Sequence, residues 1–144
     1  MGKYNLFVYG SLRDGFYNYD KYLKGKVISN TPAILGGKKL YHMPYKGYPA
    51  ILEGLDVVFG EIIEVEDYDN TVNAIDEMEN FISEENPNNE YHKTLLKVQH
   101  LNEDKQELCY VYFYNKDNDE KFDTEAVYIP NGDWKDYMLN VNNK

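Results

Sequence analysis

Two short segments, far apart in the sequence, combine residue types that could do chemistry on a small molecule. The first is residues 9–12, Tyr-Gly-Ser-Leu, where an apolar stretch runs into a glycine-containing turn. Backbone N–H groups at such turns often face a ligand. The second is Glu79, which lies between Met78 and Phe81 at the end of a helical pattern. A carboxyl group in an apolar pocket has a raised pKa and can act as a general base near neutral pH.

Both candidates have a simpler structural interpretation. From the local sequence alone, Glu79 fits a glutamate on the exposed face of a helix in an acidic protein better than a buried base. Arg13, the only arginine in the chain, directly follows the turn. It is the one side chain that could hold a carboxylate in a planar, bidentate way, and we expect it to contact the substrate. The alternative is an ordinary surface cation.

Other catalytic and metal-binding patterns are not supported by the sequence. Ser11 does not lie in a Gly-x-Ser-x-Gly elbow, and residues 10–15 lack the Lys-Ser/Thr ending of a phosphate-binding loop. Residues 67–78 lack the glycine and the glutamate that a calcium loop requires. We expect no metal site, because no metal-ligand spacing relates the three histidines, His42, His92 and His100. Cys109 lies in an apolar stretch and is predicted to be a core thiol.

Composition and charge narrow the range of partners. The chain has 144 residues, which fits a single domain over residues 1–144. Its net charge of −10 argues against nucleic acid or an anionic membrane as a partner, because both attract a cationic surface. The first residues show neither the apolar stretch of a signal peptide nor a myristoylation pattern. A cytoplasmic location is therefore expected.

The hydrophobic pattern predicts many strands and one substantial helix. The helix is expected to begin near residues 69–71, to bury one apolar face and to end near residue 80 or 82. A polar loop with a proline follows at residues 83–90 and is a candidate lid, although a plain surface loop is the simpler interpretation. The segment at 17–23 gives no decisive pattern. Strands are expected at residues 4–9, 26–35, 38–42, 48–52, 56–65, 95–101, 106–114 and 126–129, with a short helix from about residue 133.

Such an order of elements is typical of an α+β fold with a curled or closed sheet. Closed sheets hold ligands at the mouth, where the turn and the helix end could meet. Combined with the motifs, this pattern resembles the gamma-glutamylcyclotransferase-like family, which includes gamma-glutamylamine cyclotransferases and AIG2-like proteins. The resemblance spans most of the chain. It depends on residues 8–12 with Gly15, on residues 75–79 followed by Tyr91, and on residues 48–50, 58–61 and 111–112.

The resemblance implies a small mixed, mostly antiparallel β-barrel with flanking helices and a cavity at one end, and no metal or organic cofactor. It implies that Glu79 is the catalytic residue, as a general acid and base in a reaction that releases 5-oxoproline from a gamma-glutamyl amine or amino acid. The expected substrate-binding residues are Tyr9, Gly10, Ser11, Leu12, Arg13 and Tyr91.

Two positions depart from the family pattern. Lys93 stands where the family often has an arginine, which keeps the charge but not the bidentate geometry. Asn80 replaces a glycine after the glutamate, and asparagine tolerates left-handed backbone angles. Two alternative functions stay open: a non-catalytic domain that binds a small ligand, and a cyclotransferase dedicated to a gamma-glutamyl-protected biosynthetic intermediate.

Overall fold

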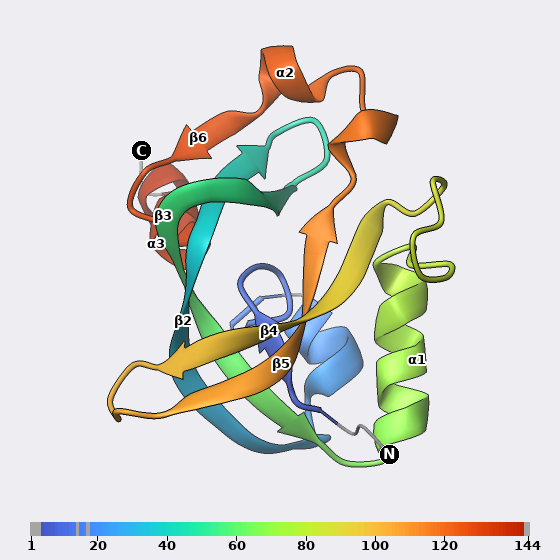
Figure 1. Ribbon diagram of the computed structural model, residues 1–144, viewed down its shortest axis with the longest axis vertical. Helices are drawn as coiled ribbons and strands as arrows, with labels where there is room; N and C mark the ends of the chain where they lie inside the picture. Colours follow the sequence, from blue (N-terminus) through green and yellow to red (C-terminus); the bar gives the residue numbers. More distant parts are fainter. Residues whose placement is uncertain (1–3, 14, 17, 143–144) are drawn as a thin grey trace.

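The longest elements are two neighbouring strands, β2 (Val27–Met43) and β3 (Tyr48–Val65), which pair as an antiparallel hairpin (Figure 1). The computed structural model describes residues 4–13, 15–16 and 18–142. Within β2, the register shifts around Lys38, which lies opposite both Glu53 and Asp56. The sequence-based prediction of four shorter strands is therefore wrong. Gly37, with a positive φ of 75°, lets the chain form a bulge and continue pairing instead of ending the strand.

The sheet closes on itself. Strand β1 (Leu6–Val8) pairs antiparallel with β3 and parallel with β5 (Gln106–Tyr114). Strand β5 pairs with β4 (Tyr91–His100), and β4 returns to β2 at Ala33 and Ile34. The ring β3-β1-β5-β4-β2 is thus a mixed, mostly antiparallel barrel, and β6 (Val127–Ile129) extends it beyond β2. This arrangement confirms the expected fold class.

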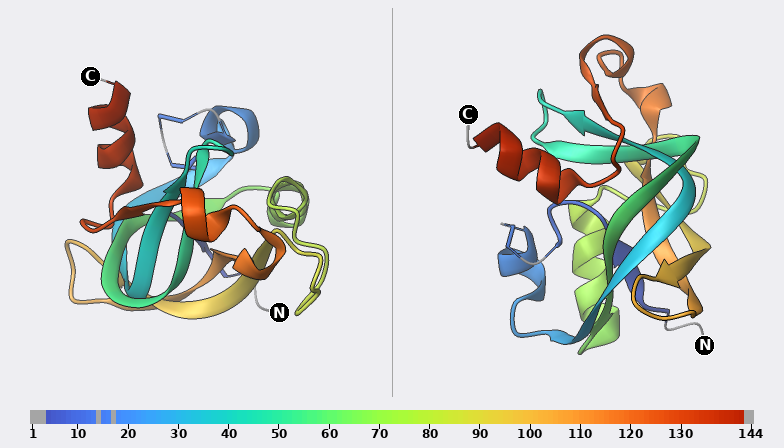
Figure 2. Two further views of the ribbon diagram at one scale, coloured as in Figure 1. Left: turned by 90° about the horizontal axis from the view of Figure 1, so that it is seen from above. Right: turned by 90° about the vertical axis from the view of Figure 1, so that its left-hand side faces the viewer.

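Helices flank the barrel on opposite sides. Helix α1 (Tyr68–Met78) lies on one side, and α3 (Trp134–Asn142) lies on the other, as Figure 2 shows. Helix α1 buries Val72 and Ile75 against the barrel, as its apolar spacing predicts. It begins and ends slightly earlier than expected. The shorter helical segments are η1 (Tyr19–Leu23), a π-helix beside α1, η2 (Lys116–Asn118) and α2 (Phe122–Glu125).

The barrel interior also anchors the C-terminal helix. Trp134, at the start of α3, is buried and packs against Phe16 with ring centroids 4.8 Å apart. Its indole Nε1 donates a hydrogen bond to Nδ1 of His42 at 3.0 Å. Burial lowers the pKa of His42, which favours the neutral ring that can accept this bond. Cys109 is buried in the same core cluster, as predicted.

None of the helices among residues 4–13, 15–16 and 18–142 is long and apolar enough to span a membrane.

Gly60 offers a test of the close contact between β3 and β1. A Cβ atom built at Gly60 would lie 2.2 Å from the backbone oxygen of Val8, so an alanine must push the two strands apart. We expect Gly60→Ala to lower the free energy of unfolding by about 1–3 kcal/mol, as measured by urea denaturation. Gly36→Ala is the matched control on β2, because a Cβ there would meet nothing within 4 Å. Equal stability of the two variants would contradict the prediction.

Candidate active site

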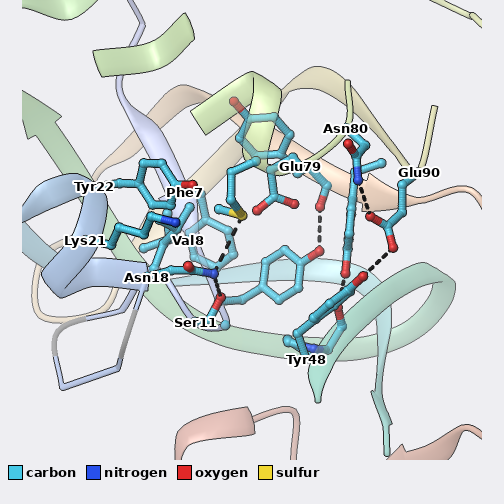
Figure 3. A pocket seen from close by; sticks show the side chains of 17 residues that line it. Phe7, Val8, Ser11, Asn18, Lys21, Tyr22, Tyr48, Glu79, Asn80 and Glu90 are labelled. Carbon is cyan, nitrogen blue, oxygen red and sulfur yellow. Dashed lines mark hydrogen bonds between the residues drawn. The ribbon is translucent and has the colours of Figure 1, made fainter. Parts of the chain in front are cut away.

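A cavity of about 290 Å³ opens at one end of the barrel. Its walls come from β1 and the turn that follows it, from η1, from the start of β3, from the end of α1 and from the start of β4 (Figure 3). Six of the predicted site residues line it: Tyr9, Gly10, Ser11, Leu12, Glu79 and Tyr91. The fold therefore brings the turn and the helix end together, although 67 positions separate Leu12 from Glu79 in the sequence.

The turn is held by contacts on both sides. The Gly10 carbonyl accepts the Arg13 N–H at 2.9 Å, and the Ser11 carbonyl accepts the Tyr19 N–H at 3.1 Å. Ser11 Oγ accepts a hydrogen bond from Asn18 Nδ2 at 2.7 Å. A Cβ at Gly10 would lie 2.5 Å from Cγ of Pro49, so only glycine lets the turn pack this closely against β3.

Three consecutive N–H groups of this turn have no protein acceptor in the described part of the chain. They belong to Gly10, Ser11 and Leu12, all of which line the cavity. Buried N–H groups in folded proteins are nearly always paired with protein, water or a ligand. Successive free amides are also a common way to bind an anionic group. The turn thus has donors available for an anion.

Two tyrosines form a rigid, neutral wall of the cavity. The Tyr9 hydroxyl donates to the Tyr112 carbonyl at 2.6 Å, and the Tyr91 hydroxyl donates to the Pro49 carbonyl at 2.5 Å. Burial, followed by the nearby charge of Glu79, raises the pKa of Tyr9 well above its usual value. Burial also raises the pKa of Tyr91. Both phenols therefore stay protonated at physiological pH and hold the backbones of β5 and β3.

Glu79 is placed by the end of α1. It is the residue after Met78, and its N–H still donates to the Ile75 carbonyl at 2.9 Å. Asn80 then takes a left-handed conformation with φ of 53°, a backbone geometry that asparagine tolerates. This change of direction leaves Glu79 on the wall of the cavity (Figure 3).

The Glu79 carboxylate has an unusual electrostatic environment. Its pKa is raised to about 8, mainly by burial and additionally by the nearby carboxylates of Glu90 and Asp76. No side chain or backbone group among the described residues donates a hydrogen bond to it. The arrangement is that of a carboxyl group desolvated in a pocket, and not that of the exposed glutamate that the local sequence by itself favoured. Such a group can take up and release a proton near neutral pH.

The two neighbouring carboxylates each accept hydrogen bonds from protein donors. Asp76 accepts hydrogen bonds from Lys93 Nζ at 3.0 Å and from the Tyr112 hydroxyl. Glu90 accepts from Lys46, Tyr48 and Asn80. Burial alone would raise the pKa of Glu90, but these donors outweigh it and lower the pKa. Glu79 is thus the carboxylate in this group to which none of the described residues donates a hydrogen bond.

Arg13, which was predicted to contact the substrate, is placed differently from the other predicted site residues. Arg13 does not line the cavity. Its Nε donates to Glu61 at 3.0 Å and its Nη1 donates to Asp133 at 3.1 Å, so the guanidinium ties the turn to β3 and to the segment before α3. Both carboxylates are distant in sequence, and only the folded chain brings them to Arg13. The residue supports the turn from behind.

Several cavity residues could not be found from the sequence. Asn18 and Lys21 come from the segment that gave no clear pattern, and Glu90 ends a loop that was predicted to be polar throughout. Lys93, at the family's arginine position, pairs with Asp76 rather than lining the cavity. Over the described ranges, no group of three or more His, Cys, Asp or Glu side chains is arranged to hold a metal ion.

Comparisons with known proteins agree with this geometry. The sequence profile of the family "Gamma-glutamyl cyclotransferase, AIG2-like" matches residues 6–136. The gamma-L-glutamyl-butirosin B gamma-glutamyl cyclotransferase of Niallia circulans is 31% identical over 135 residues, which cover 94% of this chain and 78% of that protein.

Solved structures show the same fold. An aig2-like protein from Mus musculus superposes with a TM-score of 0.59 and 25% identity, covering 76% of each chain. An uncharacterized protein from Pyrococcus horikoshii superposes with a TM-score of 0.61 and 21% identity, covering 97% of each chain. The family match spans both the turn and Glu79. The chain therefore belongs to the gamma-glutamyl cyclotransferase, AIG2-like family.

Proposed function

We propose that this protein is a gamma-glutamyl cyclotransferase that releases 5-oxoproline from a gamma-glutamyl amine or amino acid. The observation that carries the proposal is the Glu79 carboxylate, which lines the cavity, receives no hydrogen bond from the described residues, and has a pKa raised to about 8, mainly by burial. The free amides of the turn support it, because a gamma-glutamyl group carries anionic oxygen as well as an ammonium. Membership of the family supports the class of reaction.

The reaction needs a proton carrier and no protein nucleophile. The α-amino nitrogen of the substrate attacks its own γ-carbonyl carbon, a C–N bond forms, and the bond to the leaving amine breaks. Glu79 accepts the proton that the α-ammonium loses before the attack and delivers it to the departing nitrogen. The attacking nitrogen loses a second proton as the lactam forms, and this proton also passes to the leaving amine, which departs as an ammonium. Every proton is accounted for within the substrate and Glu79, so the scheme includes no metal or organic cofactor.

Positioning supplies the rest of the rate enhancement. The substrate must fold back on itself, and a cavity that holds the folded conformer replaces a rare encounter with an arranged one. The amides of Gly10, Ser11 and Leu12 suit two anionic groups: the α-carboxylate of the substrate, and the oxyanion that develops at the attacked carbonyl. Tyr9 and Tyr91 form a wall of fixed shape for either arrangement.

The first experiment measures 5-oxoproline by mass spectrometry. The panel contains gamma-glutamyl amino acids, gamma-glutamyl amines, glutathione and gamma-glutamyl-protected amine intermediates. The last group is included because of the name of the Niallia circulans relative. Product from one or more of these substrates supports the proposal. No product from any of them, together with a thermal shift caused by 5-oxoproline, would favour a non-catalytic binding domain instead.

The raised pKa of Glu79 predicts the pH dependence of the reaction. Only the ionised carboxylate can accept the proton of the α-ammonium, and burial raises its pKa to about 8. We therefore expect kcat/KM to rise about tenfold per pH unit below this value and to level off above it. The measurement is 5-oxoproline release between pH 5.5 and 9, with circular dichroism at each pH as a control for folding. A plateau that already begins near pH 5 would exclude Glu79 as the base.

A further inference from the structure

The cavity has charged side chains at opposite sides. Lys21, on η1, is the one basic side chain among the described residues that line it. Glu90, directly before β4, lines the other side (Figure 3). Glu79 lies between them. Lys21 Nζ stacks on the Tyr22 ring at 5.3 Å from its centroid and pairs with no carboxylate in the described residues.

Glu90 is held rigidly as a carboxylate. Its Oε2 accepts hydrogen bonds from Lys46 Nζ at 2.7 Å and from the Tyr48 hydroxyl, and its Oε1 accepts one from Asn80 Nδ2 at 2.9 Å. A carboxylate has about four acceptor positions, so one position remains on Oε1. The Glu90 backbone is fixed as well, because its N–H donates to Asn80 and its carbonyl accepts from Asn115. The side chain is thus prepared to accept one more donor.

Lys46 pairs with Glu90 and offsets part of its negative charge. Its Nζ lies outside the lining of the cavity, and it acts electrostatically on Asp119 as well as on Glu90. Asp119 itself accepts hydrogen bonds from the neutral hydroxyls of Tyr45 and Tyr114. One lysine therefore serves two carboxylates, and the group keeps a net negative charge on the Glu90 side of the cavity.

The reaction fixes how a substrate lies between these charges. The α-ammonium and the leaving nitrogen must both reach Glu79, which exchanges protons with each. The α-carboxylate is drawn toward Lys21 and the free amides of the turn. The remainder of the leaving amine then extends toward the opposite side, where Glu90 and Tyr48 lie.

We propose that Glu90 selects gamma-glutamyl substrates whose leaving amine carries a second, positively charged group a few bonds from the scissile nitrogen. Diamine-like and polyamine-like leaving groups fit this description. A leaving amino acid places its carboxylate next to Glu90 and is disfavoured. This inference rests on the proposed cyclotransferase reaction and names the chemical class of its leaving group.

The test uses three gamma-glutamyl amides of matched length. Their leaving amines are 1,4-diaminobutane, pentylamine and 5-aminopentanoate, which are cationic, neutral and anionic at the far end. In the wild type, kcat/KM should fall about tenfold at each step in this order, as expected for one charge pair in a partly screened site. Glu90→Gln should reduce the ratio of the cationic to the neutral substrate to near one.

The readout is the ratio of kcat/KM for the cationic substrate to kcat/KM for the neutral one, and not the rate with either substrate. The Glu90 charge also raises the pKa of Glu79, so Glu90→Gln changes the rate with every substrate, and the pentylamine derivative corrects for this. Glu84→Gln removes the same charge from an exposed position in the same loop and should leave the ratio unchanged. Lys46→Met should raise the ratio, since it leaves Glu90 without its cation.

The outcomes separate this inference from the proposed function. Equal kcat/KM for the three substrates in the wild type, or equal effects of Glu84→Gln and Glu90→Gln, would overturn the inference while leaving the reaction intact. If none of these three amides and no substrate of the earlier panel yields 5-oxoproline, the proposed function fails. Calorimetric binding of the three compounds to Glu79→Gln then decides the inference without turnover: a cationic preference supports it, and its absence refutes it.

Discussion

Replacing Glu79 by glutamine should lower kcat for 5-oxoproline release by about 10²–10⁴-fold. Glutamine has nearly the same shape but cannot accept the proton of the α-ammonium or return one to the leaving amine. The loss should fall mainly on kcat, because the turn amides and the tyrosine wall that hold the substrate are unchanged. Single-turnover kinetics with a substrate from the active part of the panel measures the effect directly.

Glu77→Gln is the matched control for this experiment. Glu77 lies on the same helix, is exposed and does not line the cavity, so the same substitution there removes one negative charge without touching the site. We expect it to change kcat by less than about twofold, since exposed charges act weakly through water. Near-normal turnover by Glu79→Gln would eliminate the mechanism. Equal losses in both variants would point to a general effect of charge.

Glu79→Gln should also stabilise the protein at alkaline pH. The pKa of Glu79 rises on folding from the ordinary value of 4.5 to about 8, mainly because of burial. Between these values the unfolded chain is ionised while the folded protein keeps its proton. The free energy of unfolding therefore falls as the pH rises through this window, and the fall stops once the folded carboxyl ionises above pH 8. Over the full window the contribution amounts to about 5 kcal/mol as an upper limit.

Glutamine does not ionise, so comparing Glu79→Gln with the wild type isolates the effect of Glu79 ionisation on stability. Near pH 4.5, Glu79→Gln and the wild type should have similar stability. At pH 8.5 the variant should be more stable by about 2–5 kcal/mol, as measured by urea unfolding. Glu90 and Asp119, whose pKa values are lowered, contribute in the opposite direction, but they are present in both proteins. If the difference in stability between the two proteins does not change with pH, burial does not disfavour the ionised form of Glu79.

The two expected results, on kcat and on stability, describe a site in which the group that makes the enzyme reactive also destabilises the fold. A buried carboxylate without a protein donor is unfavourable for the fold, and proteins keep such groups mainly where function requires them. Here Asp76 and Glu90 accept hydrogen bonds from protein donors, whereas none of the residues that the structure describes donates to Glu79. The raised pKa of Glu79 thus has two consequences: the free energy of unfolding falls by a few kcal/mol at high pH, and the carboxylate can accept a proton near neutral pH.

The local sequence was sufficient to predict the features that depend on neighbouring residues. Apolar alternation predicted β5 with its observed bounds, Gln106–Tyr114, and the helical spacing predicted the buried face of α1. The turn motif and Glu79 could be identified as candidates because a glycine turn and a carboxylate at a helix end are recognisable in sequence. The paired glycines at 36 and 37 predicted a break between two strands, whereas the structure has a bulge there and one continuous strand, β2.

What the sequence alone determined about this protein is its family pattern, its strand and helix periodicity and the kind of group that could carry the proton. Only the tertiary structure decided which charges act on that group. Burial, followed by the charges of Glu90 and Asp76, raises the pKa of Glu79, and Glu61 and Asp133 bind the Arg13 guanidinium. Burial and charge pairing depend on distances in space, and closure of the barrel sets those distances between residues as far apart in sequence as Arg13 and Asp133.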